Sequence, residues 1–330
     1  METPLTNGAV IGVDLGGTKL SAGLFDSNDE LVAREHTLVG GLSQEQLVDA
    51  LAQAVGKLIE QTEEKVVAAG FGVPTTFDQR TGIAVQAANL PIHNLPLRDV
   101  LTKRTGLPIF LDNDANVAAL AEQRKGAGAA AGVTDLIMVT LGTGYGGGIV
   151  IDGRVVAGHI GAGAELGHMS IDHNGLPCVS PNCPGVGCIE TYAGGTALAR
   201  DAQLLVQREP DGALARAVAD GSEARGETVL RLAKAGDASC LALFQEMGER
   251  LGTAFYSLVN IFNPQMIAVG GGMSPALDLL LPIATDIVRR RALAPGNEYV
   301  QIVKAAFGPD AGMVGAAIMA RDAVRTPQVA

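Results

Sequence analysis

Three cysteines and a preceding histidine form one group of residues that could carry chemistry. The set is His168, Cys178, Cys183 and Cys188. An odd number of clustered cysteines, with no secretory leader pattern at the start, points to metal rather than to disulfides. Three thiolates and one imidazole suit a closed, tetrahedral Zn²⁺ site, which we expect to be structural because no position is left for water. His173 as a substitute ligand, or free thiols, are the alternatives.

A pair of glycines between two apolar segments forms the second group. Asp14 ends the first segment, Gly16, Gly17 and Thr18 make the turn, and Lys19 follows. Adjacent glycines let backbone N–H groups face an anion, and a carboxylate at the strand end can hold Mg²⁺. Lys19 either reaches a phosphate or is solvated. The spacing is neither that of a P-loop nor that of a dinucleotide fingerprint.

The same design returns in residues 141–148, Leu-Gly-Thr-Gly-Tyr-Gly-Gly-Gly, where Gly142, Thr143 and Gly144 repeat the glycine–threonine pattern. A plain hairpin needs one or two glycines, so five among eight residues is a costly loss of backbone entropy. Two such turns predict one phosphate chain held from both sides. A third loop follows a strand and would admit a purine and ribose. Its glycines are Gly270, Gly271 and Gly272.

Acid and amide side chains gather in residues 111–116, Leu-Asp-Asn-Asp-Ala-Asn, at an expected junction of strand and helix. Asp and Asn favour helix N-caps, so a simple cap is one interpretation. The other is an acid–base centre, because a carboxylate within hydrogen-bond reach of a hydroxyl can take its proton. Strand alternation is expected to turn Asp112 away from Asp114.

The elements that position these groups follow from apolar periodicity. Ala9–Val13, Leu20–Phe25 and Leu31–Arg34 predict a meander of three strands, and Ser43 with Gln46 predicts a capped helix. Further strands are expected at Val66–Val73, Ile109–Leu111, Leu136–Thr140, Ile149–Ile151 and Met266–Val269. Each half opens with a hairpin around a glycine-rich turn and then passes to helices and strands. We therefore expect a duplicated α/β architecture.

Composition narrows the class of protein. A length of 330 residues corresponds to about two domains. The net charge of −11 argues against a nucleic-acid partner. The uncharged stretch Leu251–Leu277 is long enough to span a bilayer, but its asparagines, proline and three consecutive glycines favour a buried helix, turn and strand, so no membrane partner is expected. A cytoplasmic location is the default.

The three glycine loops resemble the phosphate-1, phosphate-2 and adenosine motifs of the sugar kinase–actin–heat-shock ATPase superfamily. From Val10 to Ala320 the chain is more closely similar to the ROK family, especially its glucokinases. Gly167-His168 and Gly187-Cys188-Ile189-Glu190 match the ROK signature. Two departures are a wider first cysteine pair and Pro184 in place of the usual glycine.

The resemblance implies an α/β fold of two ribonuclease-H-like domains around a central cleft, with a small zinc-bound loop. The expected limits are 1–117 plus 307–330 for the smaller domain and 118–306 for the larger. The implied reaction is phosphorylation of the 6-hydroxyl of D-glucose by ATP, with Mg²⁺ and structural Zn²⁺, in a homodimer or a dimer of dimers. The final helix, with its small residues, is expected to return to the first domain.

Site roles also follow from the resemblance. Asp114 corresponds to the general base, and one ring nitrogen of His168 would bind zinc while the other meets the sugar. The implied sugar contacts are Gly72, Asn89, Asn113, Asp114, Glu165, His168 and Glu190. Alternatives are another hexose or N-acetylhexosamine (fructose, mannose, N-acetylglucosamine, N-acetylmannosamine), polyphosphate as donor, and a sugar-sensing regulator without activity. A ROK repressor needs a helix-turn-helix segment before the first strand, and an actin-like ATPase gives no reason for the zinc cluster.

Overall fold

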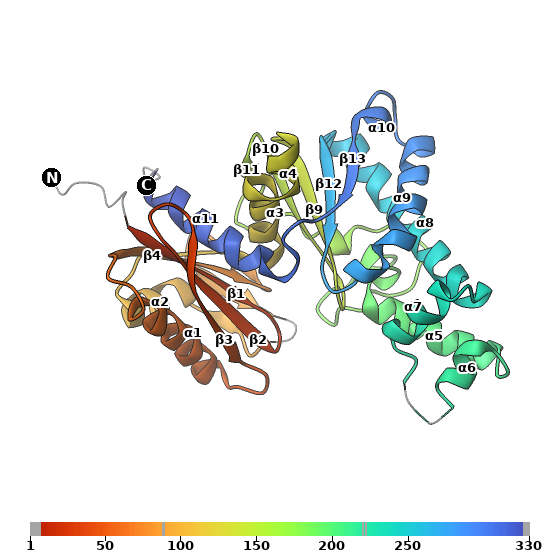
Figure 1. Cartoon of the computed structure of the whole chain (residues 1–330), viewed down its shortest axis with the longest axis horizontal. Coiled ribbons are helices and arrows are strands. Elements are labelled where there is room, and N and C mark those ends of the chain that lie inside the picture. Colours follow the sequence, from red (N-terminus) through yellow and green to blue (C-terminus); the bar gives the residue numbers. More distant parts are fainter. Residues whose placement is uncertain (1–7, 88–89, 220, 222, 326–330) are drawn as a thin grey trace. The chain divides into compact units, whose positions relative to one another are not determined.

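A computed structural model describes residues 8–87, 90–219, 221 and 223–325 (Figure 1). The chain divides into two compact units. It passes from the first unit to the second after Met138, returns at Gly148, leaves again after Ala164 and returns at Ala306. Each unit is therefore built from segments that lie far apart in the sequence.

The described residues form two five-stranded sheets and one three-stranded sheet. The first sheet has the order β3-β2-β1-β4-β8, formed by β1 Ala9–Leu15, β2 Lys19–Phe25, β3 Leu31–Leu38, β4 Val66–Val73 and β8 Ile109–Asn113. The second has the order β11-β10-β9-β12-β13, formed by β9 Leu136–Leu141, β10 Tyr145–Ile151, β11 Arg154–Val155, β12 Met266–Gly270 and β13 Gln301–Lys304. The small sheet is formed by β5 Thr76–Asp78, β6 Ile83–Gln86 and β7 His93–Leu95.

The two large sheets share one topology. Counted along the chain, the strands of each sheet follow the order third, second, first, fourth, fifth. In the first sheet β1, β2 and β3 pair antiparallel, whereas β4 and β8 run parallel to β1. In the second sheet β10 and β11 are antiparallel, and β12 and β13 are parallel. This repeat agrees with the duplicated α/β architecture expected from the sequence.

The helices of the first unit are α1 Gln44–Ile59, α2 Leu97–Thr105, α3 Asp114–Lys125, α4 Ala127–Ala131 and α11 Ala311–Arg325. Those of the second are α5 Gly195–Arg208, α6 Ala213–Ala217, α7 Gly226–Lys234, α8 Ala238–Phe262, α9 Leu277–Arg291 and α10 Gly296–Tyr299. Short 3₁₀ turns are η1 Leu166–His168, η2 Ile189–Thr191, η3 Ser274–Ala276 and η4 Gly308–Asp310. The capping box predicted at Ser43 and Gln46 is present at the start of α1.

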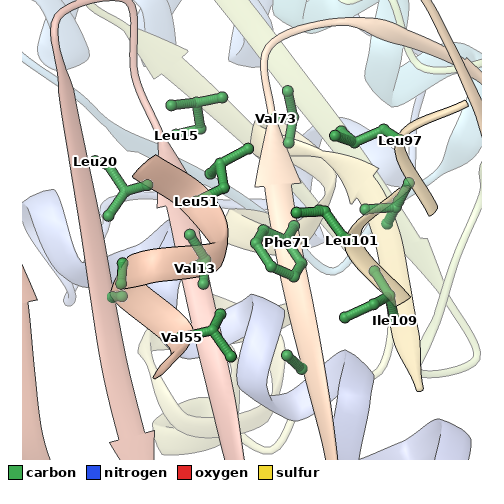
Figure 2. Close-up of a cluster of buried hydrophobic side chains, with 14 of the residues drawn as sticks. Val13, Leu15, Leu20, Leu51, Val55, Phe71, Val73, Leu97, Leu101 and Ile109 are labelled. Atoms are coloured by element: carbon green, nitrogen blue, oxygen red, sulfur yellow. The ribbon is translucent and has the colours of Figure 1, made fainter. Parts of the chain in front are cut away.

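One face of the first sheet packs against α1 and α2. Figure 2 shows side chains of β1, β2, β4 and β8 meeting those of the two helices. Phe71 of β4 lies among them and is fully buried. Alternate residues of a strand point to opposite faces, so Ile11, Val13 and Leu15 of β1 all face this core.

The opposite face of the same sheet is covered by α11, the final helix. A Cβ at Gly12 would lie 2.1 Å from the carbonyl oxygen of Met313, and a Cβ at Gly70 would lie 2.0 Å from that of Ala316. No other residue type fits at these two strand positions. The glycines of β1 and β4 therefore let the helix backbone rest directly on the sheet.

One sequence expectation changes in detail, and one is confirmed. The second glycine turn is shorter than residues 142–148, because β10 already begins at Tyr145. The loop between β9 and β10 therefore consists of only the three residues 142–144. In the segment Leu251–Leu277 the chain forms the end of α8, then β12 and η3. Within the described ranges, no helix combines the length and apolarity that a bilayer crossing requires.

Candidate functional site

The carboxyl ends of three parallel strands place candidate residues side by side in the first unit. Asp14 of β1 is in register with Gly72 of β4, and Gly72 is in register with Asp112 of β8. Asn113 follows at the last position of β8. Ligands of open α/β sheets bind at the carboxyl ends of parallel strands. Sheet register thus gathers residues that are distant in the sequence.

Gly72 is required by the close approach of α3. A Cβ at this position would lie 2.5 Å from Cγ2 of Val117 and 3.4 Å from Cα of Asp114. The start of α3 can therefore sit against the end of β4 only because the strand carries no side chain there. This contact fixes the backbone of Asp114 at the edge of the sheet.

Asn113 is the N-cap of α3, and its side chain accepts a hydrogen bond from Ala115 N at 2.9 Å. The same N–H lies 2.9 Å from Oδ1 of Asp114. The N-cap interpretation of the acid and amide cluster is thus correct for Asn113. Because this cap uses the amide oxygen of Asn113, the amide nitrogen of Asn113 can still donate to a ligand.

Asp112 is buried, with 7% of its surface exposed. Its carboxylate accepts hydrogen bonds from Asn113 N at 2.7 Å and from Nδ2 of Asn116 at 2.8 Å, and the Gln79 side chain is a further partner. Burial raises the pKa of Asp112, although these hydrogen bonds work in the opposite direction. The Asp112 carboxylate therefore stabilises the junction between β8 and α3 through buried hydrogen bonds.

Asp14 carries a strongly perturbed carboxyl group in this region. Burial, and then repulsion from Asp114, raise the pKa of Asp14 to about 7. Its carboxylate lies against the first turn of α11, where a Cβ at Gly312 would come within 2.5 Å of Oδ1. A half-buried carboxylate beside a second acid suits a divalent cation, because the cation offsets both the lost hydration and the repulsion.

The first glycine turn is open to solvent. Gly17, Thr18 and Lys19 are exposed, while Gly16 N donates to the carbonyl of Lys19 at 2.8 Å and closes the turn. Val39 N donates to the carbonyl of Thr18 at 2.9 Å and holds the turn from the β3 side. Exposed backbone N–H groups in a fixed turn can bind an anion.

In the second unit the structure brings the other two predicted loops together. Gly142 and Gly272 are neighbours, since a Cβ on Gly142 would be in ordinary van der Waals contact with Gly272 N, at 3.9 Å. Met273 N donates to the carbonyl of Leu141 at 2.8 Å, and Gly271 has a φ of +95° that suits glycine. The loop between β9 and β10 and the loop after β12 thus form one continuous glycine-rich edge.

All four predicted zinc ligands converge in the second unit, with ligand atoms within 4.8 Å of one another. Nδ1 of His168 lies 3.5 Å from Sγ of Cys178, and Sγ of Cys183 lies 3.8 Å from Sγ of Cys188. A tetrahedral zinc with ordinary bond lengths separates sulfur from nitrogen by about 3.5 Å and two sulfurs by about 3.8 Å. The donor set and its spacing therefore fit Zn²⁺.

The wide spacing of the first cysteine pair is explained by a narrow turn in this segment. Pro177 pairs with Val186, and Cys178 N donates to the carbonyl of Gly185 at 2.9 Å. The two arms lie side by side, so Cys178 faces the other donors despite its distance in sequence. His173 is not part of the cluster among the described residues; its Nε2 lies 2.9 Å from Nδ2 of Asn174.

Glu165 and Glu190 lie beside the candidate metal cluster. Burial raises the pKa of Glu165, His168 lowers it and Glu190 raises it. Because Nδ1 of His168 faces the cysteines, the other ring nitrogen is on the opposite edge of the ring. Oε2 of Glu190 accepts a hydrogen bond from Tyr145 N at 3.1 Å. This arrangement offers acceptors of the kind that a polyol requires.

Two features of the site were missed in the sequence. Gly195 N donates to the carbonyl of Gly142 at 2.8 Å, and Thr196 N donates to that of Thr143 at 2.9 Å. The signal was the Gly-Gly-Thr sequence of residues 194–196, which repeats that of residues 16–18. The second feature is Gly312 against Asp14, for which no local signal exists. Asn89 lies outside the described residues.

Comparison with known proteins agrees with this geometry. The ROK family model matches residues 10–323. The chain belongs to the ROK family. A glucokinase of Streptomyces coelicolor is 35% identical over 321 residues, covering 96% of this chain and 98% of the relative. The xylose repressor of Caldicellulosiruptor bescii is 31% identical, covering 86% of this chain and 71% of that protein.

Among solved structures, a ROK family glucokinase of Streptomyces griseus in complex with glucose and AMPPNP is 35% identical. It matches with a TM-score of 0.80 over 96% of this chain and 100% of the other. The resemblance to ROK proteins that the motifs indicated is thereby confirmed, and so is an α/β fold of the kind found in ROK kinases.

Proposed function

We propose that this protein is an ATP-dependent glucokinase, which transfers the γ-phosphoryl group of ATP to the 6-hydroxyl of D-glucose. The observation that carries the proposal is the similarity, along nearly the whole chain, to a glucokinase whose structure contains glucose and AMPPNP. The carboxylates and glycine loops described above supply the groups that such a reaction needs.

Asp114 is the proposed general base. It begins α3 at the carboxyl end of β8, where Gly72 and the Asn113 cap hold its backbone. As the oxygen of the sugar attacks phosphorus, its proton moves to the Asp114 carboxylate. Phosphoryl transfer depends mainly on positioning and charge neutralisation, so a carboxylate of moderate basicity suffices.

The sugar would be held by contacts to its hydroxyl groups. We assign these contacts to Gly72, Asn89, Asn113, Asp114, Glu165, His168 and Glu190. Carboxylate, amide and imidazole groups distinguish a polyol by the direction of each hydroxyl. Zn²⁺, when bound to His168 and the three cysteines, fixes the orientation of the imidazole, whose remaining nitrogen is then directed at a hydroxyl.

The nucleotide would be held by backbone N–H groups of the glycine loops. We assign these contacts to Gly16, Gly17, Thr18, Lys19, Gly142, Thr143, Gly144, Gly270, Gly271 and Gly272. Asp14 would hold Mg²⁺, which neutralises phosphate charge when present. The raised pKa of Asp14 supports this assignment, because a cation is the natural partner for a half-buried carboxylate next to a second acid.

A coupled assay of ADP release tests the proposal. We expect turnover with ATP and glucose, and slow release of ADP without sugar. A panel of fructose, mannose, N-acetylglucosamine and N-acetylmannosamine distinguishes a glucokinase from another ROK kinase, and polyphosphate in place of ATP tests the donor. Sugar binding without any turnover would instead favour a regulator, a class to which several relatives of this chain belong.

The domain limits and the assembly remain proposals. Limits of 1–117 plus 307–330 and of 118–306 divide α3 near its start and assign most of it, with α4, to the larger domain, whereas the compact units group both helices with the first sheet. Limited proteolysis, with cleavage near residue 117 or near residue 138, distinguishes the two divisions. Sedimentation of the purified protein tests the expected homodimer.

A further inference from the structure

The backbone of Tyr145 is held on two sides. Its N–H donates to Oε2 of Glu190 at 3.1 Å. Its carbonyl oxygen lies so close to Gly167 that a Cβ there would come within 2.2 Å. Tyr145 is the first residue of β10 and directly follows the Gly142–Gly144 turn. The end of the glycine loop is thus fixed by two residues from other segments.

Both of those residues adjoin ligands of the candidate zinc site. Gly167 directly precedes His168, and Glu190 follows Cys188 by two positions. His168 and Cys188 belong to the same cluster of four ligand atoms. A metal bound there would join the two segments that hold Tyr145, and would keep them at a constant separation.

The start of α5 holds the rest of the loop. Gly195 N and Thr196 N donate to the carbonyls of Gly142 and Thr143, at 2.8 and 2.9 Å. These two hydrogen bonds from the start of α5 restrain the backbone of the turn. Glu190 fits tightly as well, since a Cβ at Gly144 would lie 2.4 Å from its Oε2.

From these contacts we infer that Glu190 is a positioning residue for the glycine loop, and that the zinc site supports nucleotide binding as well as sugar binding. The inference rests on the proposed kinase function. A carboxylate has two oxygens, and the contact with Tyr145 uses one of them. A glycine-rich loop is flexible when free, so fixing its shape beforehand reduces the entropy lost when phosphate binds.

Glu190→Ala and Glu190→Gln separate this role from a purely sugar-binding one. The measurement is the affinity of the sugar-free protein for Mg·AMPPNP by titration calorimetry. We expect Glu190→Ala to weaken it about tenfold, the effect of losing one charge-assisted hydrogen bond. Glu190→Gln keeps an oxygen that can accept from Tyr145 N, so its affinity should stay within about threefold of the parent protein.

Glu165→Ala is the matched control. It removes a neighbouring carboxylate and should leave the affinity for Mg·AMPPNP unchanged while weakening that for glucose. Unchanged nucleotide affinity in Glu190→Ala would overturn the inference. Equal weakening by Glu190→Ala and Glu190→Gln would also overturn the inference. The effect would then come from the loss of negative charge and not from the loss of an acceptor for Tyr145 N. Absence of any nucleotide binding by the parent protein would instead refute the proposed kinase.

Zinc removal provides a second test that needs no substitution at Glu190. Treatment of the parent protein with a chelator, with folding checked by circular dichroism, should lower the affinity for Mg·AMPPNP severalfold, and added Zn²⁺ should restore it. A folded, zinc-free protein that binds the nucleotide as tightly as before would contradict the coupling.

Discussion

Asp14 and Asp114, at the carboxyl ends of β1 and β8, are close enough for the charge of one to shift the pKa of the other. Burial and this repulsion raise the pKa of Asp14 to about 7, whereas an ordinary aspartate titrates near 3.8. Two acids thus share one edge of the first sheet, and the free protein holds a proton there below neutral pH. A bound cation would displace that proton.

The first prediction concerns stability and pH. The folded state binds the Asp14 proton more tightly than the unfolded chain, so Asp14 should lower the free energy of unfolding as pH rises from about 4 to about 7. Above pH 7 the Asp14 carboxyl group is ionised in the folded protein, and its destabilising effect has reached its full size. Asp14→Asn removes the charge, and should raise the free energy of unfolding by about 1–3 kcal/mol at pH 8.

Urea denaturation of both proteins at pH 4.5 and pH 8, without divalent cations, measures this difference. The gain from Asp14→Asn should be large at pH 8 and small at pH 4.5, where the parent carboxyl is already protonated. A gain of equal size at both pH values would mean that Asp14 is ionised throughout. The same substitution should reduce turnover with Mg·ATP, since the proposed cation ligand is lost.

The second prediction concerns the general base. Asp114→Asn keeps the size of the side chain and its contact with Ala115 N, but cannot accept the proton of the sugar hydroxyl. We expect kcat to fall by about 10²-fold or more, with glucose affinity within a few fold of the parent protein. Steady-state kinetics measures kcat, and calorimetry with glucose measures the affinity for the sugar. Near-normal kcat would remove Asp114 from the mechanism.

The third prediction concerns the metal. Cys188 is 1% exposed and belongs to the cluster, so Cys188→Ser should abolish stoichiometric zinc and weaken glucose binding. His173→Ala is the matched control, because this nearby histidine lies outside the cluster and should retain about one zinc per chain. Elemental analysis of the two purified variants decides the point. Retained zinc in Cys188→Ser would show that the ligand set is wrong.

The fourth prediction tests the packing of α11 on the first sheet. A Cβ at Gly70 would lie 2.0 Å from the carbonyl oxygen of Ala316, whereas a Cβ at Gly56 in α1 meets no atom within 4 Å. Gly70→Ala should therefore lower the free energy of unfolding by about 2–4 kcal/mol. Gly56→Ala should raise it by about 0.5–1 kcal/mol, because alanine is the better helix former.

Thermal and urea unfolding of the two variants provide the comparison. Both variants replace glycine by alanine in the same unit. If their free energies of unfolding change in opposite directions, the difference comes from the close approach of α11 to the strand at Gly70. If Gly70→Ala proved as stable as the parent protein, α11 would have to sit farther from the sheet than the structure places it.

Local features of the fold were predictable from the sequence. Apolar periodicity located β4 at Val66–Val73 with both ends correct, and Ser43 with Gln46 located the start of α1. Asp152 and Gly153, a residue pair typical of two-residue hairpin turns, both have positive φ, at 50° and 70°. Such features depend on side chains and backbone preferences within a few residues, which a sequence displays directly.

The sequence by itself determined the chemical inventory of this protein: two glycine–threonine turns, a set of three cysteines and one histidine, and an acid–amide cluster before a helix. Only the tertiary structure decided which of these meet. Strand register aligns Asp14, Gly72 and Asp112. The close contact of Gly144 with Glu190 joins the glycine loop to the segment that follows Cys188, and the contact of Gly195 with Gly142 joins the loop to α5. These relationships depend on the packing of segments dozens of residues apart, and no local preference in the chain encodes that packing.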